Sequence, residues 1–181
     1  MLSWLIRRKI DGFQKNYSYD MDYMRDVLDA SLPATMTFHK ATGLGRHRED
    51  LPKDAWYAAK LVSMLREDCG PCTQLLADMA THEGVSPETI RAVLKHDRQS
   101  MSDDVGLTVD FAIAVLARDP SADGLRREVV DRFGRRGLVT LAFALLSSKL
   151  YPTLKYALGY GHACSVVHVD GAAVATPREA F

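Results

Sequence analysis

Apolar residues recur at intervals of three and four positions along most of the chain, which is the period of amphipathic α-helices. The pattern is most regular after Pro52, where glycine or proline residues separate one apolar segment from the next. It predicts helices over residues 55–65, 72–83, 86–96, 103–116, 125–133 and 138–160, the last with a kink at Pro152. We therefore expect an all-α protein whose core is a compact helical bundle.

The first 50 residues have a weaker pattern, which predicts a helical arm in front of this core. Residues 19–31 carry apolar side chains on one helical face, and Pro33 predicts the end of that helix. A second short helix and an exposed, charged connector are expected before Pro52. We place the arm and connector at residues 1–50 and the helical core at 51–161.

The pattern says least about the tail, residues 162–181. Val166, Val167 and Val169 are compatible with an extended segment, because β-branched residues favour strands. The segment is followed by Gly171-Ala-Ala, and no partner strand is evident in the sequence. We therefore predict an irregular tail and no strand elsewhere in the chain.

Composition and charge exclude several classes of partner. Lys and Arg together number 23 and so do Asp and Glu, so a net charge of zero gives no field that would gather nucleic acid or an anionic membrane. The first residues lack the order of a signal peptide, and the apolar stretch 138–146 is far shorter than the roughly 20 residues of a membrane span. Three cysteines do not form a secreted disulfide framework. We expect a cytoplasmic protein with no nucleic-acid or membrane partner.

The chemically loaded segment is Glu67-Asp68-Cys69-Gly70-Pro71-Cys72. Gly70 and Pro71 predict that one helix ends and another begins at the cysteines, where the first-turn amides favour a thiolate. Two thiols at this spacing can close a disulfide, and either can attack a peroxide or another disulfide. Asp68 is expected to cap the new helix, which leaves Glu67 as a candidate general base or a solvated charge.

The two cysteines are expected to differ in access. Cys72 lies on the apolar stripe of its predicted helix with Leu76 and Met79, whereas Cys69 faces the chain break and should meet solvent more easily. A buried thiolate suits a small hydroperoxide, and an exposed thiol suits a bulky reductant. We therefore assign Cys72 as the attacking cysteine and Cys69 as the resolving one.

Residues from about 55 to 158 resemble the alkylhydroperoxidase D and carboxymuconolactone decarboxylase-like superfamily. The similarity lies in the apolar helix before Glu67-Asp68-Cys69-Gly70-Pro71-Cys72, the step Gly84-Val-Ser-Pro-Glu-Thr-Ile90 and the segment Phe111-Ala-Ile-Ala-Val115. It covers a little over half of the chain. The resemblance implies a small all-helical oligomer with a redox-active cysteine pair at the start of a central helix.

The sequence departs from the peroxidase branch of this superfamily at two positions. There the second cysteine is assisted by a histidine one helical turn later and by a glutamate about twelve residues before the first cysteine. Here those positions hold Leu76 and Tyr57. Neither leucine nor a tyrosine with an ordinary pKa near about 10 replaces an imidazole and a carboxylate. The resemblance therefore assigns only Cys69 and Cys72.

Other residues support weaker alternatives. His162, Cys164 and His168 would have to join the two cysteines to bind zinc, and no pattern places the tail beside them. His82 is expected on a solvated helix face, and Cys164 is expected to be a small buried residue. The tail's histidines therefore give only a minor zinc hypothesis. An interleaved set of charges predicts a solvated face or subunit contact at Arg126, Arg127, Arg132, Arg135 and Arg136.

Together the residues predict a thiol/disulfide oxidoreductase that reduces a small hydroperoxide or a disulfide and is regenerated by a thiol reductant. We expect no metal or organic cofactor. The wide apolar stripe over residues 107–116 predicts a homo-oligomer, because it exceeds what one small core can cover. The alternative is an oligomeric helical protein that binds a ligand or partner without turnover.

Overall fold

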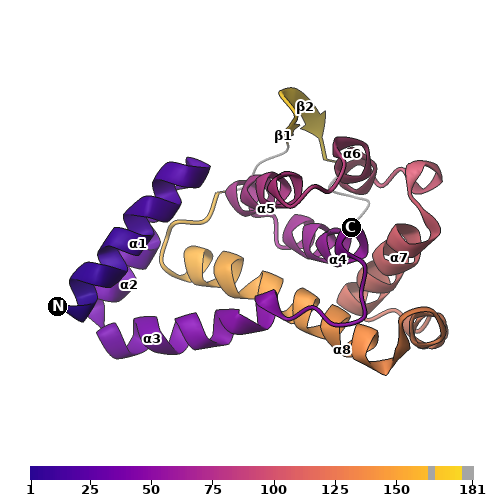
Figure 1. Ribbon diagram of the computed structural model, residues 1–181, viewed down its shortest axis with the longest axis horizontal. Coiled ribbons are helices and arrows are strands. Elements are labelled where there is room, and N and C mark those ends of the chain that lie inside the picture. Colours follow the sequence, from indigo (N-terminus) through magenta and orange to yellow (C-terminus); the bar gives the residue numbers. More distant parts are fainter. Residues whose placement is uncertain (163–165, 177–181) are drawn as a thin grey trace.

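The computed structural model describes residues 1–162 and 166–176, and most of them lie in helices (Figure 1). The helices are α1 (Leu2–Tyr17), α2 (Asp22–Ala30), α3 (Leu32–Ala41), η1 (Thr42–Arg46), α4 (Lys53–Arg66), α5 (Gly70–His82), α6 (Pro87–Lys95), η2 (Arg98–Ser100), α7 (Asp103–Ala117) and α8 (Ala122–Ala157). The strands are β1 (Val166–Val169) and β2 (Ala172–Ala175). The predicted helical class is confirmed, with the hairpin as an addition.

Helix α4 is the centre of the main core, and α5, α6, α7 and α8 pack around it (Figure 1). Every residue from 55 to 64 is buried. Alanines at positions 55, 58 and 59 let the neighbouring helices approach closely, while Leu61 and Val62 fill the space between them. A helix that is apolar on all sides is expected at such a place.

The ends of the core helices follow the polar residues in the sequence. Ser86 caps α6 by accepting a hydrogen bond from the amide of Thr89 at 3.1 Å. Gly84 adopts a left-handed conformation, with φ at 79°, just before that cap. Helix α7 is capped by Ser102 and not by one of the aspartates that follow it. The two following aspartates instead lie in the first turn, where the helix dipole favours negative charge.

Helix α8 is broken at Gly134, whose φ of 72° and ψ of 176° lie outside the helical region. Pro152 lies inside the second segment and is buried. By length and composition alone α8 is apolar enough to cross a membrane, with an 18-residue window of mean hydropathy 1.3 that is 44% buried inside the protein. Leu141 and Leu145 on this segment are buried in the main core.

The first 30 residues fold back onto the core and form a second apolar cluster. Its buried members from α1, α2 and the loop between them are Ile10, Tyr19, Met21, Tyr23, Met24 and Leu28. They pack against Leu75 of α5 and against Tyr151 and Leu154 of α8. The arm is therefore joined to the cysteine-bearing helix and to the end of α8 by a core of its own.

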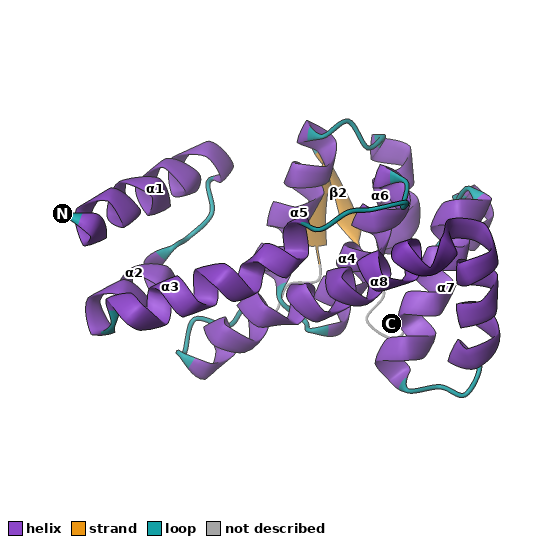
Figure 2. Ribbon diagram, turned by 60° about the horizontal axis from the view of Figure 1, so that its bottom comes forward, coloured by secondary structure: helices purple, strands orange, loops and turns teal. Residues whose placement is uncertain are grey.

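The tail is not irregular over residues 166–176, which corrects the prediction made from the sequence. Strands β1 and β2 pair in antiparallel register, with Val167 opposite Val174. The hairpin that they form lies against α5 and α6 (Figure 2). Asp170 and Gly171 form the turn with φ values of 52° and 73°. The partner strand is the Ala-rich segment after the turn, which has low β propensity and was therefore missed.

A buried cysteine pair as candidate redox site

Cys69 and Cys72 are joined by a disulfide at the start of α5, where the sequence predicted the redox segment. Cys69 occupies the N-cap position and Cys72 lies in the first turn, with their Cα atoms 5.3 Å apart. Asp68 precedes them with φ at 49° and turns the chain out of α4. Because the N-cap is Cys69, the prediction that Asp68 holds this position was wrong.

Both sulfur-bearing residues are buried, which corrects the predicted difference in access. Cys69 is 1% exposed and Cys72 is 2% exposed. The segment before α5 does not open Cys69 to solvent, because Tyr156 donates a hydrogen bond to the carbonyl of Asp68 at 2.9 Å. The amide of Gly70 donates to the carbonyl of His162 at 3.2 Å. An external reductant therefore needs a local opening to reach either sulfur.

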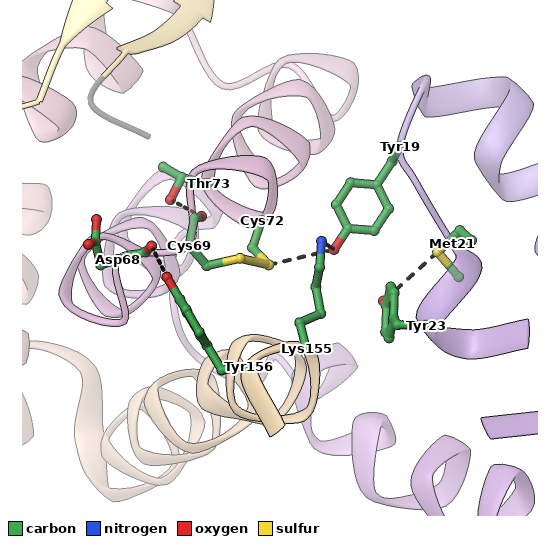
Figure 3. Close-up of a disulfide and its surroundings, with 9 residues drawn as sticks. All are labelled: Tyr19, Met21, Tyr23, Asp68, Cys69, Cys72, Thr73, Lys155 and Tyr156. Carbon is green, nitrogen blue, oxygen red and sulfur yellow. Dashed lines mark hydrogen bonds between the residues drawn. A yellow bond between two sulfur atoms is a disulfide. The ribbon is translucent and has the colours of Figure 1, made fainter. Parts of the chain in front are cut away.

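The arm supplies the side chain that covers the disulfide. The hydroxyl of Tyr19 lies 3.5 Å from Cys72 Sγ, and in the disulfide form Tyr19 is the donor because the sulfur carries no hydrogen (Figure 3). Lys155 of α8 donates from Nζ to the same hydroxyl oxygen at 3.3 Å. Cys72, Tyr19 and Lys155 thus form a continuous polar path between three segments that are far apart in the sequence.

This polar path lies in an apolar and aromatic environment. Lys155 is 3% exposed, and its ammonium lies 4.7 Å from the ring centroid of Tyr19 and 5.3 Å from that of Tyr23. Burial lowers the pKa of Lys155, and the carboxylate of Asp20 partly opposes that shift. Burial raises the pKa of Tyr19 to about 12. The oxidised site therefore holds a lysine whose charge is poorly solvated.

Glu67, the predicted general base, lies at the C-terminal end of α4. Its carboxylate forms an ion pair with Lys149 at 3.0 Å, with 22% of the Glu67 side chain exposed. This ion pair holds the carboxylate against α8, while Tyr19 is the side chain that reaches Cys72. A role for Glu67 as a base remains a prediction from its position in the sequence.

The two positions that depart from the peroxidase pattern are both buried. Leu76 is 4% exposed and Tyr57 is 1% exposed, and both belong to the main core. Burial raises the pKa of Tyr57, and a hydrogen bond to Glu83 adds to that shift. A neutral phenol in this position cannot accept a proton at neutral pH, so these two residues do not replace a histidine and a carboxylate.

The minor candidates lie elsewhere or form ordinary contacts. The ring of His82 lies on an exposed part of α5 and packs on Tyr17, with centroids 5.6 Å apart. His168 lies in β1, and its backbone forms hydrogen bonds with Gln74 of α5. Cys164 lies outside the described residues. Within residues 1–162 and 166–176, no group of three or more histidine, cysteine or acidic residues is placed to hold a metal ion.

Three of the five clustered arginines form exposed ion pairs with acidic residues. Arg126 pairs with Asp123, and Arg132 pairs with Asp104 at 2.6 Å. Arg136 pairs with Asp50 at 2.7 Å and links α8 to the loop before α4. The interleaved charges thus neutralise one another locally, as expected of a solvated face.

Sequence reasoning missed Tyr19 and Lys155 as parts of the site. Lys155 had a detectable signal, because it continues the buried face of α8 that runs through Leu141, Ser148 and Pro152 at helical spacing. A lysine on such a face needs a buried polar partner. Tyr19 had no comparable signal, since its position depends on how the arm folds back onto the core.

Comparison with known proteins adds no assignment. No family model, no curated protein and no solved structure matches this chain. The class that the fold and site define is a helical protein with a buried disulfide at the start of a core helix.

Proposed function

We propose that this protein is a thiol/disulfide oxidoreductase in which Cys69 and Cys72 alternate between a dithiol and a disulfide. The observation that carries the proposal is the position of the bond. Cys69 is the N-cap of α5 and Cys72 lies in its first turn, so their disulfide links no two separate elements of the fold. A crosslink over so short a loop removes little entropy from the unfolded chain, which leaves chemistry as the better reason for it.

We propose a small hydroperoxide as the oxidising substrate, since both cysteines are buried in the main core and Cys72 is covered by Tyr19 of the second apolar cluster. The Cys72 thiolate attacks the outer oxygen, so that an S–O bond forms and the O–O bond breaks. The leaving alkoxide takes a proton and departs as an alcohol. Cys69 then attacks the sulfenic sulfur, which releases water and closes the disulfide. A thiol reductant restores both thiols and is itself oxidised.

The assignment of Cys72 as attacking cysteine rests on its contact with Tyr19. A hydroxyl at 3.5 Å can donate a hydrogen bond to a thiolate at Cys72 Sγ and so favour its ionised form. Cys69 instead has its backbone carbonyl bonded to Thr73 Oγ1 at 3.0 Å, a contact that does not involve its sulfur. Cys69 is accordingly the resolving residue.

The alkylhydroperoxidase D-like type of fold belongs to the same proposal. It is supported by the order of the core helices and by the disulfide at the start of α5, which packs on the buried residues 55–64 of α4. Cytoplasmic location and a homo-oligomeric state are also proposed. Helix α7 is largely covered by α4 and α8, so the exposed Val139 and Leu146 of α8 are the better candidates for subunit contact.

The test uses the reduced full-length chain with Cys164 replaced by serine, so that only the pair can react. One equivalent of hydroperoxide should remove two thiols per chain within the mixing time of the reaction, as measured by mass spectrometry. A dithiol should restore both thiols over repeated cycles. Cys69→Ser should accumulate a sulfenic acid at Cys72. Loss of thiols no faster with hydroperoxide than in air would contradict the proposal and favour a binding protein without turnover.

A further inference from the structure

The polar path from Cys72 through Tyr19 to Lys155 has no role in a protein whose disulfide is only structural. Lys155 is buried, and within residues 1–162 and 166–176 it forms no ion pair with a carboxylate. Its ammonium donates to Tyr19, whose hydroxyl in turn points at Cys72 Sγ (Figure 3). Reduction of the disulfide would place on this path a thiol, which ionises more readily than the buried phenol of Tyr19.

We infer that Tyr19 and Lys155 are the proton relay of the Cys72 thiol, and that the Cys72 thiolate is the counter-ion of Lys155 in the reduced protein. This inference rests on the proposed function and supplies the base that Leu76 and Tyr57 do not. It makes the arm part of the catalytic machinery, because Tyr19 belongs to the loop between α1 and α2.

The proton steps balance along this path. When Cys72 ionises, its proton passes to the oxygen of Tyr19, and the phenolic proton of Tyr19 passes to the neutral amine of Lys155. The products are a thiolate and an ammonium, with Tyr19 again neutral. After the thiolate has attacked the hydroperoxide, the ammonium returns its proton through Tyr19 to the alkoxide. Tyr19 never accumulates as a phenolate, which agrees with its pKa of about 12.

The groups around Lys155 favour this charge exchange. Burial lowers the pKa of Lys155, which shifts its equilibrium toward the neutral amine that can take a proton. Tyr23 of α2 is buried and Tyr151 of α8 is half-buried, and burial raises the pKa of both phenols, so both stay neutral. Asp20, which is exposed, is the acidic residue whose charge favours the ammonium. A Cys72 thiolate, linked to the Lys155 ammonium through Tyr19, would therefore favour the protonated form of Lys155 more strongly than the exposed Asp20 does.

The test measures the pKa of the Cys72 thiol in a chain where Cys69 and Cys164 are both serine. The ultraviolet absorbance of the thiolate is measured as a function of pH, with no substrate present. A unit charge about 7 Å away at the effective dielectric of a protein shifts a pKa by about 1–2 units. We therefore expect Lys155→Met to raise the thiol pKa by about that amount, and Tyr19→Phe to raise it as well.

Two matched variants control for the loss of a buried lysine or of a tyrosine hydroxyl. Lys60→Met removes a buried lysine that bonds Gly45 and packs on Trp56, and Tyr160→Phe removes a hydroxyl that bonds Asp26. Both should leave the thiol pKa unchanged. An equal thiol pKa in the parent chain, in which Cys69 and Cys164 are serine, and in its Tyr19→Phe and Lys155→Met variants would overturn the relay even if hydroperoxide turnover is present. A shifted pKa without turnover would support the relay and refute the peroxidase.

Discussion

Helix α2 provides a way to test whether the arm controls access to the disulfide. Leu28 is 5% exposed in the second apolar cluster, which also contains Tyr19 and Leu75. Replacing a buried leucine by alanine costs about 2–5 kcal/mol, because apolar contacts are lost and a cavity remains. If that cost falls on the docking of the arm, Leu28→Ala raises the population of the open form by at least about 30-fold.

The assay is reduction of the disulfide by dithiothreitol under native conditions, quenched by alkylation and followed by mass spectrometry. When closing is faster than reduction, the rate follows the population of the open form and stays linear in reductant concentration. We therefore expect Leu28→Ala to be reduced at least about 30-fold faster than the wild type.

The matched control is Leu141→Ala, which removes the same atoms from the main core, where Leu141 is 0% exposed. It should lower global stability by a similar amount and leave the native-state reduction rate nearly unchanged. Equal acceleration in both variants would show that reduction requires global unfolding. That result would refute the idea that the arm opens on its own.

Three further predictions concern stability and assembly. Burial lowers the pKa of Lys60 to about 8, below its ordinary value of 10.5, so between these values the unfolded chain binds more protons and stability rises with pH. The rise is up to about 3 kcal/mol, and denaturant titrations of Lys60→Met against pH should lack it. Gly171→Val should cost about 1–2 kcal/mol by thermal unfolding, because φ at this turn position is 73°. Leu146→Glu should shift light-scattering mass toward the 20.1 kDa of one chain if α8 forms the subunit contact, and an unchanged mass would exclude that contact.

The core helices could be predicted because their signals are local. The apolar period from residue 55 onward, the cap at Ser86 and the proline at the start of α5 each depend on neighbours within one or two turns. The position of the cysteine pair followed from Gly70 and Pro71 in the same way. Because such signals are present in the sequence itself, the helices predicted from them are found in the structure.

The features that could not be predicted depend on contacts between distant segments. Cys69 was expected to be accessible because it starts a helix, but Tyr156 and His162 from the end of the chain close over that helix start. The hairpin was missed because its second strand is alanine-rich and gains its burial at Val174 only by packing on the core. Neither contact leaves a mark on the spacing of apolar residues along the chain.

The site gives a physical reason for the presence of the arm. A methionine in place of Lys155 would fill a similar space with no charge to desolvate, so the lysine costs stability in the disulfide form. That cost is offset when a thiolate forms beside it, because two opposite charges in a buried site stabilise each other more than they would in water. The offset requires water to be kept out and Tyr19 to be held between the two groups, and both conditions depend on the packing of α1 and α2. A chain with the same cysteine pair but no docked arm would keep the buried disulfide segment and lose the environment that makes Cys72 reactive.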